Sequence, residues 1–308
     1  MRVVAIKAER SIAVRADPDR LWQLLLSPAI WSLKARAFMF EVPGDDRLRF
    51  WVGSTAQGLP SNGLYEVAED HNARSVTFHE PLPSRHYYRL AVRPERRGAV
   101  KVHIEVARYP SRMQADAVER ATRAGLARWL HGIRAVAENR NPAPSDLISA
   151  EVQRLCLQVP RQPGDWIAVT ETAVIRADPN RVWAAISTPH FDPSSQNAPV
   201  ACGVVPGTPA GQAGEMQYFV ERTPDGALKS DAIGTSAMTD AMGAVTHRVK
   251  PPYDQTRYRV SADGSQANLV ITWSGPPGPD GANREPMASA LRSTLSNYKT
   301  ALEGIAEP

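Results

Sequence analysis

The sequence predicts an α+β fold made of two tandem copies of one domain, each a curved antiparallel sheet packed against a long C-terminal helix. Three observations predict it. The segment 14–22 recurs at 175–183, the middle of each half alternates with the period of a strand, and each half closes on a long amphipathic pattern. The offset of 161 residues, from residue 14 to residue 175, is about the length of one ordinary domain.

Each copy is expected to open as a strand, a sharp turn and a short helix. Residues 14–22 read Val-Arg-Ala-Asp-Pro-Asp-Arg-Leu-Trp and residues 175–183 read Ile-Arg-Ala-Asp-Pro-Asn-Arg-Val-Trp, identical at six of nine positions. Asp17 and Asp178 are predicted N-caps, because a carboxylate accepts hydrogen bonds from the free N–H groups of a first helical turn. The proline after each takes the first helical position, where a missing N–H costs nothing.

Strands are expected where apolar and polar residues alternate between turn residues. The segment 226–241 is ambiguous, since it could be a further strand or an insertion. The expected strands lie near 37–42, 47–54, 63–69, 74–80, 85–93 and 99–108 in the first copy, and near 200–205, 215–222, 244–250, 255–261 and 267–274 in the second.

Long helices are predicted at 111–138 and 285–305, where apolar residues recur three or four positions apart. Both patterns end in Ala-Glu, at Ala137–Glu138 and at Ala306–Glu307.

A short helix at 145–158, between two proline-rich breaks, is the expected linker. The predicted organisation is a first domain at 1–139, a linker at 140–165 and a second domain at 166–308.

The composition indicates an ordinary globular protein, with 43% apolar and 22% charged residues. No apolar run approaches the ~20 residues that cross a bilayer, and the N-terminus lacks a signal-peptide pattern, so we expect a soluble cytoplasmic protein without a membrane span. Cys156 and Cys202 form no CxxC pair, which favours neither a zinc site nor a disulfide framework. The net charge of +4 is scattered, which argues against a nucleic-acid partner.

The Ala-Asp-Pro-x-Arg-x-Trp openings resemble those of the START-like superfamily, which includes the Bet v 1 allergens and the polyketide cyclases. Lys-Pro-Pro-Tyr-Asp at 250–254, followed by Thr-Arg-Tyr at 256–258, looks like a hairpin common there. The two-domain layout resembles the bacterial two-domain aromatase/cyclases of polyketide pathways. The resemblance implies tandem helix-grip domains with a sheet–helix cavity, no cofactor and a hydrophobic small-molecule ligand. It leaves open an acyl carrier protein as a further partner.

Alternation along the strands predicts which side chains face the long helix, because successive residues of a strand point to opposite faces. It directs His79, Lys101, His103 and Glu105 outward, where they should be solvated. The predicted ligand-lining residues are Phe38, Phe40, Phe50, Tyr65, Phe78 and Trp129 in the first copy, and Tyr218, Tyr258, Trp273 and Tyr298 in the second.

Three polar residues on the predicted inner faces are the candidate catalytic residues: His86, Tyr88 and His247. A histidine in an apolar cavity can act as general acid or base near neutral pH, and a nearby tyrosine hydroxyl can polarise a ketone. The alternative is a histidine that hydrogen-bonds a backbone carbonyl. No zinc-protease, P-loop, dinucleotide or nucleophile-elbow motif is present, and no metal site is expected.

The sequence leaves three functions open. One is a cofactor-free cyclase, aromatase or dehydratase acting on a polyketide-like substrate, with acid–base groups converging in a cavity. Another is a non-catalytic protein that carries or sequesters a hydrophobic small molecule. A third, an interaction role with one cavity lost, is favoured by the Gly/Pro-rich segment 206–211 of the second copy.

Overall fold

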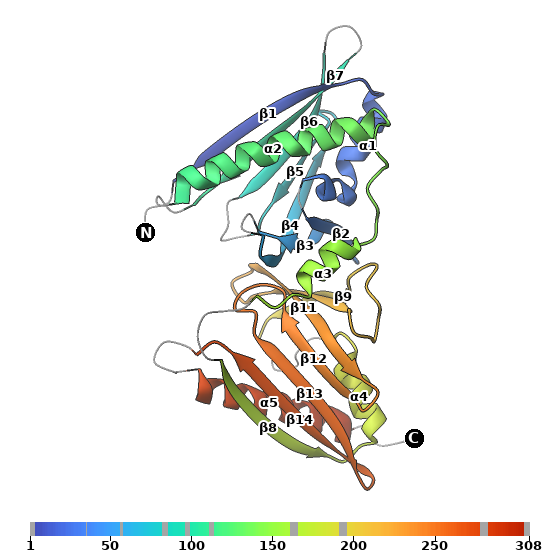
Figure 1. The fold of residues 1–308 in the computed structure, drawn as a ribbon, viewed down its shortest axis with the longest axis vertical. Helices are drawn as coiled ribbons and strands as arrows, with labels where there is room; N and C mark the ends of the chain where they lie inside the picture. Colours follow the sequence, from blue (N-terminus) through green and yellow to red (C-terminus); the bar gives the residue numbers. More distant parts are fainter. Residues whose placement is uncertain are drawn as a thin grey trace. The chain divides into compact units, whose positions relative to one another are not determined.

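The structure, a computed structural model, divides into two compact units that share one architecture. Unit 1 holds Met1–Val152 with Ala227–Lys229, and unit 2 holds Gln153–Gly226 with Ser230–Pro308. Each unit is a seven-stranded antiparallel sheet with a long C-terminal helix, so the predicted fold of two tandem helix-grip domains is confirmed (Figure 1). The described residues are 4–34, 36–55, 58–81, 86–95, 99–110, 114–160, 166–190, 196–277 and 283–304.

The first sheet has the strand order β1-β7-β6-β5-β4-β3-β2, so the opening strand pairs with the last one. Figure 1 shows the long helix α2 running across one face of this sheet. The elements are β1 (Ile6–Val14), α1 (Pro18–Leu26), the 3₁₀ helix η1 (Pro28–Leu33), β2 (Ala37–Val42), β3 (Asp45–Ser54), β4 (Pro60–Asp70), β5 (Ser75–His79), β6 (Tyr87–Pro94), β7 (Val100–Arg108) and α2 (Ala115–Ala137).

The second sheet repeats that order as β8-β14-β13-β12-β11-β10-β9. The ambiguous segment 226–241 contains one twelve-residue strand, β11, rather than an insertion. A short helix α3 (Ala150–Cys156) precedes this sheet. The other elements are β8 (Ile167–Ile175), α4 (Pro179–Ser187), β9 (Ala198–Val204), β10 (Met216–Arg222), β11 (Leu228–Thr239), β12 (Gly243–Arg248), β13 (Gln255–Asp263), β14 (Gln266–Gly275) and α5 (Arg284–Glu303). In the described part of the chain, no helix is long and apolar enough to cross a membrane.

The repeated openings form the predicted caps. The Asp17 carboxylate accepts from the backbone N–H groups of Asp19 and Arg20, at 3.0 and 2.9 Å. The Asp178 carboxylate accepts from the N–H of Asn180 at 2.8 Å. Without the carboxylate, these N–H groups of the first helical turn would have no partner within the helix. The repeated motif therefore supplies the same cap to both helices.

A second repeated contact closes each unit. The Glu138 carboxylate, just after α2, accepts from the backbone N–H of Arg15 at 3.0 Å. The Glu303 carboxylate, at the end of α5, accepts from the N–H of Arg176 at 2.8 Å. The structural counterpart of Glu138 is therefore Glu303. Glu307, which the Ala-Glu endings paired with it, lies outside the described residues.

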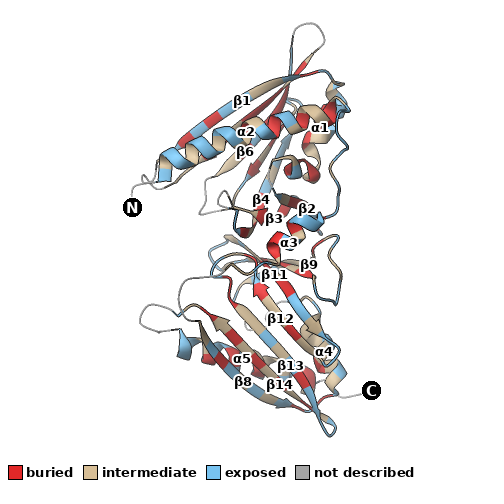
Figure 2. Cartoon of the chain, viewed as in Figure 1, coloured by how far each residue is buried: buried red, intermediate tan, exposed pale blue. Residues whose placement is uncertain are grey.

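The core of unit 1 lies between α2 and the sheet. Figure 2 shows buried residues of α2 alternating with exposed ones, as expected for a helix with one apolar face. Trp129, from the buried face, is fully enclosed. Removing a buried side chain of this size costs about 3–5 kcal/mol of stability, so this face fixes the helix on the sheet.

The sheet register corrects one prediction about faces. Phe40 lies opposite Phe50, whereas Met39 lies opposite Trp51, and directly opposed residues share a face. Met39 belongs to the core with Trp129, so the phenylalanines point to the other face.

Three predicted lining residues are therefore on the wrong side: Phe38, Phe40 and Phe50. Their rings form a separate cluster, with centroids 5.8 and 5.6 Å apart along the series. The pattern failed because both faces of β2 are buried: Phe38 is 3% exposed and Met39 is 1% exposed.

His103 corrects a second prediction. It lies on the outer face, opposite Ser11, yet it is only 7% exposed. Its Nδ1 is 2.9 Å from the Ser11 hydroxyl, and its Nε2 is 3.6 Å from a Glu9 carboxylate oxygen. Burial lowers the pKa of His103, with Arg93 adding to the effect. His79, also predicted to face outward, is exposed.

Candidate functional site

Lys34 is the residue around which the candidate site of unit 1 is built, and the sequence pattern did not point to it. It follows η1, and its backbone N–H donates to the carbonyl of Trp31 at 3.0 Å. Residues three apart lie on the same side of a 3₁₀ turn. This local geometry places the Lys34 Nζ 4.4 Å from the centroid of the Trp31 ring.

Aromatic rings from three elements, η1, β6 and α2, surround the amine. The Lys34 Nζ lies 3.6 Å from the centroid of the Tyr88 ring and 5.4 Å from that of Trp129. The Trp31 ring stacks on Tyr65, with centroids 5.0 Å apart and planes at 23°. We call Trp31, Tyr65, Phe78, Tyr88 and Trp129 the aromatic wall.

The wall is held in place from the helix side. The Trp129 indole N–H donates to the Ile30 carbonyl at 3.0 Å, which fixes η1 on α2. A Cβ on Gly132 of α2 would lie 3.1 Å from the Leu33 Cβ, so the glycine lets η1 approach closely. These two contacts determine where Trp31 and Lys34 point.

A chain of charged groups reaches the wall at Tyr88. The Arg108 guanidinium carbon lies 4.8 Å from the Tyr88 ring centroid. Its Nη1 is 3.7 Å from a Glu80 carboxylate oxygen, and the other Glu80 oxygen is 3.0 Å from His86 Nδ1. His86 also stacks on Tyr109, with planes at 5°.

The two sequence candidates in unit 1 are therefore linked, but they play different parts. Tyr88 is buried at the centre, and both cations lie against its ring. His86 precedes β6 and its side chain is 27% exposed, so it lies at the edge of the cluster. Lys34, Glu80 and Arg108 complete the group.

Burial shifts two proton equilibria at this site. Desolvation, with a smaller effect of Arg108, holds the pKa of Lys34 well below its ordinary value, while Glu80 opposes the shift. Desolvation, with a smaller effect of Glu80, raises the pKa of the Tyr65 phenol. Tyr65 is therefore a protonated hydrogen-bond donor at neutral pH. Among the described side chains, no carboxylate forms an ion pair with Lys34.

The arrangement suits carbonyl chemistry. Aromatic side chains of this kind can contact a conjugated or cyclic ligand through their faces and edges. A fixed cation and a phenol donor at its edge can stabilise negative charge that develops on a carbonyl oxygen. Within the described residues, no cluster of three His, Cys, Asp or Glu could hold a metal ion.

The corresponding face of unit 2 carries a different pair. Trp273 belongs to the core with residues of α5, and Tyr258 and Tyr298 pack against that core. The Tyr298 hydroxyl is 3.0 Å from His190 Nε2, and His190 Nδ1 is 2.7 Å from a backbone carbonyl. The carbonyl requires a proton on Nδ1, so Nε2 accepts from the tyrosine. Tyr218, on β10, is buried against Gly203 of β9.

His247 lies on the other face of its strand. Ala244 opposes Tyr258, whereas His247 opposes Gly234 on β11, so His247 and Tyr258 point away from each other. The prediction that they share a face is wrong, because the apolar Val245, two residues before His247, lies on the face opposite to that of Tyr258. The His247 Nε2–H donates to the Cys156 carbonyl at 3.0 Å, and burial lowers its pKa. This contact is the alternative to catalysis named above, a histidine that hydrogen-bonds a backbone carbonyl.

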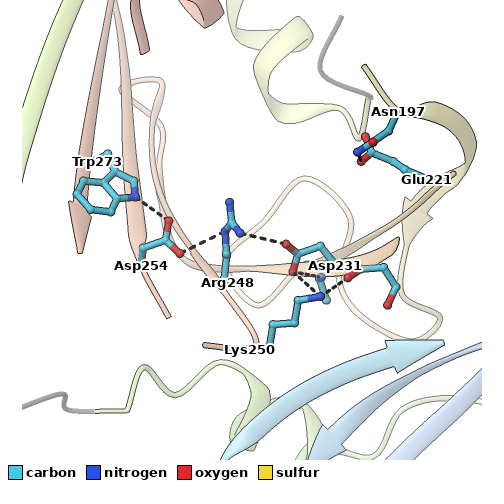
Figure 3. Close-up of polar contacts among 9 residues, drawn as sticks. Asn197, Glu221, Asp231, Arg248, Lys250, Asp254 and Trp273 are labelled. Carbon is cyan, nitrogen blue, oxygen red and sulfur yellow. Dashed lines mark hydrogen bonds and ion pairs between the residues drawn. The ribbon is translucent and has the colours of Figure 1, made fainter. Parts of the chain in front are cut away.

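A network of charges stabilises the hairpin at the end of β12 (Figure 3). The Trp273 indole N–H donates to Asp254 at 2.6 Å, and the other Asp254 oxygen is 3.2 Å from Arg248 Nε. Arg248 and Lys250 both approach Asp231, at 3.5 and 3.9 Å. Each charge faces an opposite charge, which is the arrangement of a structural network.

The chain is similar to known two-domain and one-domain proteins of this fold. It is 18% identical to the di-domain ARO/CYC BexL from the BE-7585A biosynthetic pathway, covering 98% of this chain and 100% of that one, with a TM-score of 0.37. It is 11% identical to the di-domain ARO/CYC StfQ from the steffimycin biosynthetic pathway, covering 96% of this chain and 98% of that one, with a TM-score of 0.34. It is 9% identical to a START superfamily protein from Mycobacterium smegmatis, covering 44% of this chain and 99% of that one, with a TM-score of 0.36. No protein-family model and no curated protein matches the chain.

Proposed function

We propose that unit 1 is a cofactor-free cyclase, aromatase or dehydratase that acts on a hydrophobic, carbonyl-rich, polyketide-like chain. The observation that carries the proposal is the convergence of the Lys34 amine and the Arg108 guanidinium on the ring of Tyr88, inside an aromatic wall. Arg108 is paired with Glu80, whereas Lys34 is half-buried and forms no ion pair with a carboxylate among the described side chains. A cation taken out of water without a partner costs free energy, so the place of Lys34 at this apolar face favours a functional explanation.

The chemistry that these residues support is an intramolecular aldol reaction followed by loss of water. The Tyr65 phenol, kept protonated, donates a hydrogen bond to a ketone oxygen. Glu80 takes a proton from a neighbouring CH₂, and Arg108 stabilises the enolate that forms. The enolate carbon then bonds to a second ketone carbon. Loss of water from the aldol gives a ring that stacks on the aromatic wall, and stacking favours the flat product.

Glu80 and His86 are proposed to exchange protons at the edge of the site. Their 3.0 Å contact lets one carboxylate–imidazole pair hold a single proton, and the partly exposed His86 can pass it to solvent. Glu80 and His86 lie beside the aromatic wall. Interactions between charged groups are stronger there than in bulk water. An acyl carrier protein that delivers the chain remains part of this proposal.

Product analysis tests the proposal. A poly-β-ketone thioester is generated in the presence of the protein, and the products are separated by liquid chromatography and identified by mass spectrometry. We expect a shift from spontaneous to regiospecifically cyclised, dehydrated products. Lys34→Met and Tyr65→Phe should abolish the shift, and Lys7→Met, which removes an exposed lysine of β1, should preserve it.

The carrier alternative predicts a different result in the same experiment. The aromatic wall alone could bind a flat molecule without transforming it. Quenching of tryptophan fluorescence by a polycyclic aromatic ligand, together with an unchanged product distribution, would establish the carrier and refute the enzyme. Neither quenching nor altered products would refute both.

A further inference from the structure

Lys34 differs from the other described lysines in its surroundings. Lys250 approaches Asp231, and Lys299 lies 4.0 Å from a Glu303 oxygen. Lys7 is exposed on β1. The Lys34 amine instead lies among three aromatic rings, beside the cationic Arg108. Its surroundings are those of a nucleophile rather than of a surface charge.

The balance of forces favours the neutral amine more than at any exposed lysine. The ring contacts stabilise the ammonium form. Taking an ammonium out of water costs more free energy than these contacts return, and a neighbouring guanidinium repels it further. Arg108 carries a guanidinium and no nucleophilic amine, so it acts on Lys34 without competing for the reaction. A lysine that is desolvated beside a second cation is the arrangement that activates an amine for attack on a carbonyl.

We propose that Lys34 forms a reversible imine with a ketone or aldehyde carbon of a ligand held on the aromatic wall. The amine nitrogen bonds to the carbonyl carbon, and the oxygen takes up a proton to give a carbinolamine. Loss of water then leaves a C=N bond, and the return of water restores the free amine and the ketone. The step needs no oxidant, reductant or cofactor.

Tyr65 and Glu80 are placed to assist proton movement in this step. The Tyr65 ring lies 6.1 Å from that of Tyr88 and stacks on Trp31, and its phenol remains a donor. It can donate a hydrogen bond to the carbinolamine oxygen, while that oxygen takes a proton from the Glu80–His86 pair and leaves as water. Glu80, held by Arg108 and His86, can receive the proton that the nitrogen loses.

An imine at Lys34 rests on the proposed function for the identity of its ligand, a carbonyl-rich chain. It also deepens that function. The C–H groups next to a C=N bond are more acidic than those next to a ketone when the nitrogen is protonated. The derived enamine would be the carbon nucleophile that closes the ring.

Reductive trapping tests the imine without depending on cyclisation. The full chain is incubated with 2-hydroxy-1-naphthaldehyde, a flat aromatic aldehyde, and sodium cyanoborohydride, and the modified lysine is located by peptide mass spectrometry. We expect Lys34 to be labelled at least tenfold faster than Lys7 at neutral pH. Lys34→Arg should abolish the fast phase, and Lys7→Arg should leave it unchanged. Prior addition of naphthalene, a flat aromatic hydrocarbon without a carbonyl, should slow it if the aldehyde binds on the aromatic wall.

The pH profile adds a readout that a merely structural lysine would not give. The fast labelling should reach half of its maximum at a pH well below the ordinary lysine pKa of about 10.4. Equal labelling of Lys34 and Lys7, or fast labelling that survives in Lys34→Arg, would overturn the proposal. Because Lys34→Arg could disturb the core, circular dichroism is compared with wild type, and Lys34→Met serves as a second variant.

The outcome separates this inference from the proposed function. Cyclisation that requires Lys34, with no trapped adduct, would refute the imine and leave Lys34 acting through its charge. A trapped adduct without any cyclisation would establish the reactive lysine and refute the cyclase.

Discussion

Replacing Lys34 with methionine should stabilise unit 1, because the half-buried lysine lowers the free energy of unfolding of this unit. Methionine has a similar length and fills the same space among the rings. The variant loses the contacts of the ammonium with Trp31 and Tyr88, worth about 2 kcal/mol together when desolvated. It also removes the desolvation cost of the amine, which is several kcal/mol. The net gain should be about 1–2 kcal/mol.

Urea unfolding measures this gain. For a unit of this size, with a slope of about 2 kcal/mol per molar urea, the midpoint of the unit 1 transition should rise by about 0.5–1 M. Lys7→Met, which removes one exposed positive charge, should leave the midpoint unchanged. A midpoint for Lys34→Met at or below that of wild type would refute the argument that Lys34 is retained for function.

The pH dependence of the gain checks its cause. The pKa of Lys34 is lowered in the folded state, so the unfolded chain binds more protons between that value and about 10.4. Wild-type stability therefore rises with pH across this window, and it reaches its full value above 10.4. Methionine does not titrate, so it makes no pH-dependent contribution to stability. The advantage of Lys34→Met should shrink as pH approaches 10, and a constant advantage would assign it to packing instead.

Three further predictions address the frame around the site. Glu138→Gln should cost about 1–2 kcal/mol by weakening the bond to the Arg15 N–H, and because the pKa of Glu138 is lowered, urea midpoints of wild type and variant should converge as pH falls below about 4.3. Gly63→Ala should cost about 1–3 kcal/mol in thermal unfolding, since its Cβ would lie 2.6 Å from the Trp51 indole nitrogen; an unchanged melting temperature would contradict the packing. His247→Gln should remove part of the loss of unit 2 stability below pH ~6.5, because burial lowers the pKa of His247 and the unfolded chain takes up the proton first; an identical acid profile would exclude this role.

The elements that sequence predicts well are those set by local rules. The caps at Asp17 and Asp178 each follow from one carboxylate and the N–H groups of the next few residues, so a repeated motif was enough to find them. The long helices follow from their apolar spacing, and the structure confirms both.

Faces of strands were harder to predict, because alternation identifies the inner face only when the other face is exposed. At Phe38 and Met39 both faces are buried, and at His247 the polar residue itself is buried away from α5. The register between strands decides these cases, and it is not encoded in the alternation.

The centre of the candidate site could not be read from the sequence for a related reason. A lysine after a short helix is normally a solvated residue. The Lys34 amine contacts the ring of Trp129, nearly a hundred residues further along the chain, and the ring of Tyr88 on β6. Only the fold brings these rings to it. His190 is similar, since only the fold brings it to Tyr298. The i to i+3 spacing of Trp31 and Lys34 was the one local signal available.

The most direct test of the central claim, that unit 1 carries the chemistry, is the product distribution from a poly-β-ketone thioester with Lys34→Met compared with Tyr298→Phe. Tyr298→Phe removes the hydroxyl that donates to His190 in unit 2 and leaves unit 1 untouched. We predict that Lys34→Met returns the products to the spontaneous mixture and that Tyr298→Phe retains regiospecific cyclisation. Loss of that cyclisation in Tyr298→Phe, with Lys34→Met behaving as wild type, would contradict the account and move the site to unit 2.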